Sequence, residues 1–213
     1  TLFRSEFGEA GVVGGALNDL VNVSGNLTLD GTIDVSVPAG GSFGPGIYRV
    51  FDYGGVLTDN GLALGTMPGG SAVSVQTAIA GQVNLVNAAG LTLNFWDGTV
   101  GPKNNDLVDG GNGVWQLGGD DNWTGATGAV NADYAQNSFV IFSAAPGTVT
   151  IDNGGGDVLT TGMQFASDGY VIAGGPLTLT GGQAIVQVGD GSTAGAGYTA
   201  TIDAVLAGSA RLA

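Results

Sequence analysis

The stretch LTLDGTIDVSV at residues 27–37 alternates apolar and polar side chains, with Leu, Ile and Val at every second position on either side of a glycine. An alternation with a period of two places the apolar side chains on one face of a β-strand. The pair Asp30-Gly31 interrupts the alternation, and pairs of this kind are typical of turns. The stretch therefore predicts a half-buried strand, a break at Gly31 and a second strand.

Similar short strands recur along the chain. The Leu-Thr-Leu start of this stretch is found again at residues 91–93 and 177–179, and related alternating segments lie at residues 148–152 and 170–172. The distances between the three starts are close to multiples of about 21 residues, and such a repeat is typical of a solenoid. Gly, Asp and Asn between the segments fit the tight corners of such a fold.

The composition predicts an ordered all-β protein. Gly accounts for 42 of the 213 residues, but the mean hydropathy is +0.28 and only 10% of the residues are charged. Disordered chains instead combine low hydrophobicity with high charge. The most helix-like segment, residues 200–213, fits a strand almost as well. We therefore predict a parallel β-helix whose inward Val, Ile and Leu side chains stack from turn to turn, with a β-sandwich as the alternative fold.

The residue types that are missing exclude several classes of function. The chain has no Cys and no His, so it has no disulfide, no thiolate or imidazole metal ligand and no Ser-His-Asp triad. Four basic residues against 18 acidic ones give a net charge of −14, which disfavours binding to nucleic-acid phosphates. No apolar run is long enough for a membrane span. We therefore expect no nucleic-acid partner and no insertion of this segment into a membrane.

Residues 95–142 differ from the rest of the chain. They contain all three Trp residues and a dense set of acidic residues, and their apolar residues alternate only weakly. We predict a single β-helical segment over residues 1–213, with rungs at 1–94 and 143–213. The region between them is predicted to be an irregular protruding insertion or a set of wide loops.

The same region supplies the candidate binding residues. Aromatic rings interleaved with carboxylates and amides are typical of surfaces that stack sugars or contact proteins. The alternative is that the Trp rings cap the apolar core where the insertion leaves the solenoid, because Trp is usually buried. The candidate surface residues are Trp96, Trp115, Trp123, Tyr134, Asp120 and Asp121.

Two acidic motifs raise the questions of metal binding and catalysis. The segment DLVDGGNG at residues 106–113 partly resembles the nonapeptide of calcium-binding β-rolls, with Asp106 and Asp109 as candidate ligands, but it occurs once. Asp120 and Asp121 could act as an acid and base pair on a glycosidic bond, but neighbouring residues on a strand point to opposite faces. We therefore predict no catalytic residue, no cofactor and no metal site beyond this weak calcium candidate.

Several short phrases occur in a particular order along the chain. They include NDLVNV at 18–23, GNLTLDGT at 25–32, FGPGIYR at 43–49 and NFWDG at 94–98. In this order they resemble the passenger region of large autotransporters, the type V secreted proteins of Gram-negative bacteria, particularly adhesin-like members from alphaproteobacteria. The resemblance covers nearly the whole chain and implies a right-handed parallel β-helix that is exported through the periplasm and the outer membrane to the cell surface.

The resemblance also implies a function and partners. It implies a non-enzymatic stalk or adhesion segment that contacts a host-cell surface, an extracellular-matrix protein or a glycan, or that mediates self-association between cells. A signal peptide and a C-terminal β-barrel translocator are expected outside residues 1–213, since the chain begins at Thr1 and we expect it to be a piece of a longer protein. The alternatives are a polysaccharide-active β-helix enzyme and a segment that assists passenger folding during secretion.

Overall fold

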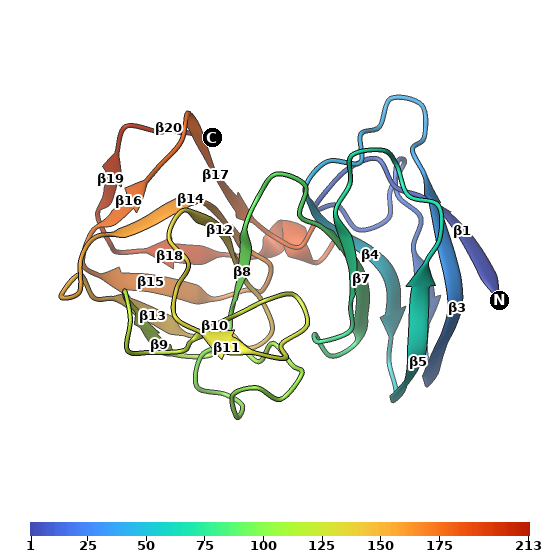
Figure 1. Ribbon diagram of the computed structural model, residues 1–213, viewed down its shortest axis with the longest axis horizontal. Coiled ribbons are helices and arrows are strands. Elements are labelled where there is room, and N and C mark those ends of the chain that lie inside the picture. Colours follow the sequence, from blue (N-terminus) through green and yellow to red (C-terminus); the bar gives the residue numbers. More distant parts are fainter. The chain divides into compact units, whose positions relative to one another are not determined.

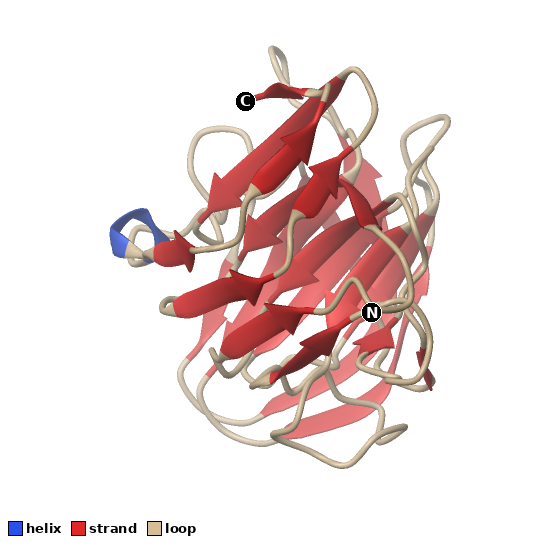
Figure 2. Ribbon diagram, turned by 90° about the vertical axis from the view of Figure 1, so that its left-hand side faces the viewer, coloured by secondary structure: helices blue, strands red, loops and turns tan.

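Strands make up nearly all of the regular structure (Figures 1 and 2). The computed structural model describes residues 1–213, and its single helical element is the short 3₁₀ turn η1 (Gly195–Gly197). No helix has the length and apolar composition needed to cross a membrane. The prediction of an all-β protein is therefore confirmed.

The chain forms two compact units, Thr1–Gly90 and Leu91–Ala213. Each unit has its own buried apolar cluster and its own sheets. None of the sheets closes on itself, so each keeps edge strands. The two units are described separately below.

The first unit contains two sheets. Its strands are β1 (Leu2–Glu6), β2 (Val21–Val23), β3 (Leu27–Ser36), β4 (Gly46–Tyr53), β5 (Leu57–Leu64), β6 (Val73–Gln76) and β7 (Gln82–Asn87). One sheet has the order β1-β3-β5, and the other has the order β2-β4-β7-β6. Until β6, consecutive strands thus alternate between the two sheets.

Three strand pairs of the first unit, β1–β3, β3–β5 and β2–β4, are parallel. Leu27 of β3 is the register partner of Leu57 of β5, and Val21 of β2 is the partner of Phe51 of β4. The side chain of Asn26 binds the backbone of Val56 with the same spacing of 30 residues. The repeat of about 21 residues predicted from the Leu-Thr-Leu starts is therefore wrong for this unit, because its stacked strands repeat with a regular spacing of 30 residues, as between Asn26 and Val56.

Residues 27–37, which were predicted to form two strands, contain the single strand β3. β3 runs through Gly31, where φ is +105° and the register with β5 shifts. Gly61, at the matching place in β5, also has a positive φ, of +90°. A glycine in this conformation bends a strand at a β-bulge without ending it. The predicted break at Gly31 is thus one β-bulge within a continuous strand, and its extra residue lies in β5, since Leu29 pairs with Asp59 and Gly31 with Leu62.

The second unit also contains two large sheets. Its strands are β8 (Leu93–Trp96), β9 (Gly113–Trp115), β10 (Trp123–Thr124), β11 (Asn131–Ala132), β12 (Ser138–Phe142), β13 (Thr148–Ile151), β14 (Val158–Phe165), β15 (Tyr170–Gly174), β16 (Leu177–Leu179), β17 (Gln183–Val188), β18 (Ala200–Ile202), β19 (Leu206–Gly208) and β20 (Arg211–Leu212). One sheet has the order β18-β15-β13-β9, visible as a stack in Figure 1. The other has the order β11-β10-β8-β12-β14-β16-β19, with β17 beside β14 and β20 beside β17. The segment 200–213 is therefore extended and not helical.

The sheets are mixed, which corrects the prediction of purely parallel pairing. Most strand pairs are parallel, as predicted, but β4–β7, β6–β7, β8–β10 and β10–β11 are antiparallel. The hairpin β6–β7 adds to the last strand of one sheet of the first unit, and β10–β11 adds to the first strand of a sheet of the second unit. Short loops join the strands of these two hairpins, at residues 77–81 and 125–130, whereas β4–β7 and β8–β10 pair strands that other elements separate in the chain. Parallel strands always need such longer crossovers.

Asn and Asp side chains at the strand ends tie neighbouring strands together. The Oδ1 atom of Asn26 accepts a hydrogen bond from Val56 N at 2.8 Å, and Asn112 does the same for Thr148 N at 2.8 Å. Each side chain adds a bond between strands at the end of a ladder. These bonds explain why Asn and Asp are frequent beside the strands of this chain.

Candidate functional site

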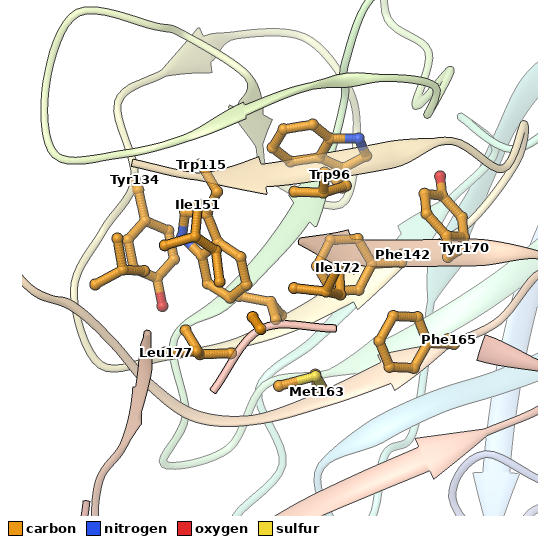
Figure 3. Packing of buried hydrophobic residues seen from close by; sticks show 14 of the residues in the cluster. Trp96, Trp115, Tyr134, Phe142, Ile151, Met163, Phe165, Tyr170, Ile172 and Leu177 are labelled. Carbon is orange, nitrogen blue, oxygen red and sulfur yellow. The ribbon is translucent and has the colours of Figure 1, made fainter. Parts of the chain in front are cut away.

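The four aromatic residues predicted to form a binding surface are buried together in the core of the second unit. Trp96, Trp115 and Trp123 are at most 1% exposed, and Tyr134 is 6% exposed. Ring centroids of Trp123 lie 5.0 Å from those of Trp96, Trp115 and Tyr134. Figure 3 shows Trp115 and Tyr134 side by side among the aliphatic side chains of the cluster. The prediction of an aromatic surface is therefore wrong for these residues, and the core alternative describes them.

Strand pairing brings these rings together. Trp123 of β10 is the antiparallel register partner of Trp96 of β8, and Trp115 of β9 is the parallel partner of Ile151 of β13. Burial of large aromatic rings is strongly favourable because each removes a large apolar area from water. The phenol of Tyr134 donates to the carbonyl of Leu159 at 2.8 Å, and burial raises its pKa well above the usual range.

Directly beside this core, the carboxylate of Asp97 is enclosed by hydrogen-bond donors. Asp97 follows Trp96 at the end of β8 and is 2% exposed. Its Oδ1 accepts the N–H of Asp109 at 2.8 Å, and its Oδ2 accepts the side-chain N–H of Asn131 at 2.7 Å. A buried carboxylate is stable only when donors satisfy its oxygens in this way. Asp97 is therefore a structural group that fixes two distant segments.

The ammonium group of Lys103 completes this polar cluster. Its Nζ donates to the backbone carbonyls of Asp97 and Gly98, the latter at 2.7 Å, and to Oδ1 of Asn122 at 3.0 Å. Burial lowers the pKa of Lys103, while the carboxylates of Asp97, Asp121, Asp120 and Asp109 act in the opposite direction. Three donors meeting three oxygens leave the cation turned into the protein instead of toward solvent.

Two loops are joined above this cluster. We name residues 97–112, between β8 and β9, the long loop, and residues 125–130, between β10 and β11, the short loop. Asn104 N donates to Oδ1 of Asn131 at 2.7 Å, and Asn131 N donates to Oδ1 of Asn104 at 2.8 Å. A Cβ atom added at Gly128 would lie 2.2 Å from the carbonyl oxygen of Leu107, so the two loops touch there.

The acidic candidates do not converge. Asp120 accepts the side-chain N–H of Gln116 at 2.9 Å, and Asp121 is exposed. Asp106 is exposed with a φ of +63°, whereas Asp109 accepts the side-chain N–H of Asn105 at 2.8 Å. No group of three or more acidic side chains is placed to hold a metal ion. Asp120 and Asp121 stay adjacent in sequence and share no ligand in this arrangement.

Comparison with known proteins places this geometry in context. Over all 213 of its residues, the chain is 58% identical to the adhesin BmaC autotransporter of Brucella suis biovar 1 (strain 1330), a Gram-negative alphaproteobacterium. The chain is thus similar along its whole length to an autotransporter. It spans 6% of the length of that relative. The predicted resemblance to the passenger region of an alphaproteobacterial autotransporter is confirmed. No family model matches the chain, and no solved structure matches it.

The sequence did not predict the cluster around Asp97. The pair Asp97-Gly98 is a turn signal in the sequence, and the partner Asn131 lies 34 residues away. One signal was present: Lys103 is the only basic residue between Arg49 and Arg211, and it lies in an acidic region. A lone cation in such a region is a candidate for an internal ion pair or hydrogen-bond partner.

Proposed function

We propose that this chain is a non-enzymatic segment of an autotransporter passenger that takes part in adhesion at the bacterial surface. The observation that carries the proposal is the similarity of the whole chain, without a gap in coverage, to a protein named as an autotransporter adhesin. Since the chain matches a small part of that protein, the segment contributes to adhesion together with other regions. Its position at the cell surface follows from the same proposal.

We further propose that the parallel strands of these sheets form the rungs of a right-handed β-helix. In the second unit, Val149 of β13 pairs with Ile172 of β15, and Val171 of β15 pairs with Thr201 of β18. The strands of the facing sheet alternate with these in sequence. Parallel crossover connections are almost always right-handed, which supports the handedness. Such a stack supplies a stiff support on which loops are presented.

A non-enzymatic role agrees with the chemistry of the polar groups. The best-enclosed carboxylate, that of Asp97, accepts hydrogen bonds from the protein at both oxygens and is 2% exposed, so a substrate has no direct access to it. The ammonium group of Lys103 likewise donates its hydrogen bonds to oxygen atoms of the protein. Neither group is therefore poised for general acid or base catalysis.

Deletion in the full-length protein tests the proposal. The full-length protein that contains these residues is produced at the surface of a Gram-negative host, with and without residues 1–213. Surface display is measured with an antibody against a distant epitope, and attachment to cultured host cells is counted. A second deletion of equal length elsewhere in the protein serves as the control.

Three results separate the possible roles. Normal display with reduced attachment supports the adhesion role. Normal display with unchanged attachment contradicts it and leaves a purely mechanical stalk. Loss of display in this deletion, but not in the control, assigns the segment to folding during secretion and also contradicts the adhesion role.

A further inference from the structure

We propose that the long loop and the short loop form one contact surface for a protein segment that is both basic and apolar. The proposal rests on the proposed adhesion function and names the chemistry of the partner. It is carried by three observations: exposed aliphatic side chains on both loops, hydrogen bonds that attach the loops beneath them, and an excess of negative charge around them.

Aliphatic side chains on the two loops face solvent. Val100 is 59% exposed, Leu107 is 41% exposed and Val130 is 68% exposed. Leu107 and Val130 belong to the parts of the loops that are joined, since Gly128 packs against the backbone of Leu107. Exposed apolar side chains gathered on loops are typical of interaction sites, because a partner removes them from water.

The loops are held rigidly from below. The carboxylate of Asp97 binds both the backbone of Asp109 in the long loop and the side chain of Asn131 at the end of the short loop. The paired bonds between Asn104 and Asn131 close the junction, and the indole N–H of Trp96 donates to Gly111 O at 2.8 Å. A surface that is already ordered loses less conformational entropy when a partner binds.

The charge around the loops selects the partner. Asp106, Asp121 and Asp133 are exposed in this part of the chain. The nearby cation, Lys103, turns its ammonium group inward to three protein oxygens. The surface therefore presents apolar groups beside an excess of negative charge, since Lys103 is the single cation among these aspartates. Complementarity then requires a partner with Lys or Arg beside apolar side chains, and it disfavours anionic glycans.

Binding of synthetic peptides to the 213-residue chain tests this inference. The probes are three peptides of equal length that alternate Lys with Leu, Glu with Leu, and Lys with Ser. Affinity is measured by fluorescence polarisation at about 0.15 M and about 0.5 M NaCl, because salt screens interactions between exposed charges. We expect the Lys-Leu peptide to bind best and to bind more weakly at the higher salt concentration.

Variants locate the surface. We expect Leu107→Ser and Val130→Ser each to weaken binding of the Lys-Leu peptide by about tenfold, as burial of an aliphatic side chain predicts. Asp106→Asn keeps a residue that tolerates the left-handed conformation and removes one charge, so it should weaken binding mainly at low salt. The matched controls are Val205→Ser, at a side chain 68% exposed elsewhere in the unit, and Asp30→Asn in the first unit.

The outcomes decide between the surface and non-specific attraction. Equal losses in the loop variants and the controls, or equal binding of the Lys-Ser and Lys-Leu peptides, would overturn the inference. Circular dichroism of each variant confirms that its fold is retained, and Val130→Ser provides a second apolar test if Leu107→Ser is poorly folded. Failure here leaves the adhesion role itself intact, because the deletion experiment measures attachment without reference to these loops.

Discussion

The rings of Phe142 and Phe165 are stacked, with centroids 5.0 Å apart and planes inclined by 13°. The two residues are register partners in the parallel strands β12 and β14, so the stack follows directly from the pairing of the backbone. Both rings are fully buried, and Figure 3 shows them in the same core as Tyr170 and Met163. The two inward-facing phenylalanines thus align from one strand to the next.

Truncation of one ring in this stack should strongly destabilise the second unit. Phe165→Ala removes a buried ring and leaves a cavity beside Phe142, so we expect a loss of about 3–5 kcal/mol in the free energy of unfolding. Phe165→Leu fills much of the space and should cost less. Urea unfolding followed by tryptophan fluorescence measures both, because all three Trp residues lie in this core. Equal stability of the two variants would show that the site collapses around the missing ring.

The internal position of Lys103 predicts a structural cost when its charge is removed. Lys103→Met leaves the carbonyls of Asp97 and Gly98 and the amide oxygen of Asn122 without their donor. We expect a loss of about 1–3 kcal/mol in the free energy of unfolding. The control Arg211→Met removes a positive charge from an exposed side chain and should change stability by less than about 0.5 kcal/mol. Similar effects of both substitutions would mean that net charge, and not the oxygen cluster, governs the result.

The alternation of apolar and polar side chains predicts where the strands lie. Contacts between residues far apart in sequence determine which side chains are buried together, and these contacts cannot be predicted from the alternation. The alternation of side chains identified β13, β15 and β16, because a period of two is a property of the strand itself. The composition of residues 95–142 predicted an aromatic cluster, but its burial depends on the pairing of Trp96 with Trp123. The cluster around Asp97 was missed because Asn131, its partner, lies 34 residues away in sequence.

Stability at high pH should depend on the buried phenol of Tyr48 in the first unit. This side chain is fully buried and donates to Gly44 O at 2.9 Å, and burial raises its pKa to about 12. In the unfolded chain a tyrosine ionises near about pH 10. The folded state therefore holds its proton more tightly, so this contribution is complete below about pH 10 and is lost as the pH rises toward about 12.

Tyr48→Phe separates this effect from other titrations. The variant loses the hydrogen bond to Gly44 and should be about 1 kcal/mol less stable than the natural chain near neutral pH. Between about pH 10 and about pH 12 the difference should shrink and then reverse, because phenylalanine cannot ionise on unfolding. Thermal unfolding of both proteins across this range measures the difference. Curves that stay parallel over the whole range would contradict the assignment.

Two glycines with nearly the same backbone conformation provide a matched test of how the loops are joined. Gly118 has a φ of +73° and Gly128 a φ of +70°, so alanine is strained to a similar degree at both. A Cβ atom at Gly118 would meet nothing within 4 Å, whereas one at Gly128 would lie 2.2 Å from Leu107 O and 2.5 Å from Leu107 N. The two positions therefore differ mainly in the contact between the loops.

Gly118→Ala should cost about 1 kcal/mol, which is the conformational strain alone. Gly128→Ala adds a steric clash with the backbone of the long loop, so we expect a total of about 2–4 kcal/mol. Chemical denaturation gives both values, and limited proteolysis shows whether the long loop is cleaved more rapidly in Gly128→Ala. The contact is a rigid junction only if the second variant is clearly less stable and its long loop is cleaved faster. If the two variants unfold alike and are cleaved at the same rate, Leu107 moves aside without cost and the two loops are not mechanically coupled.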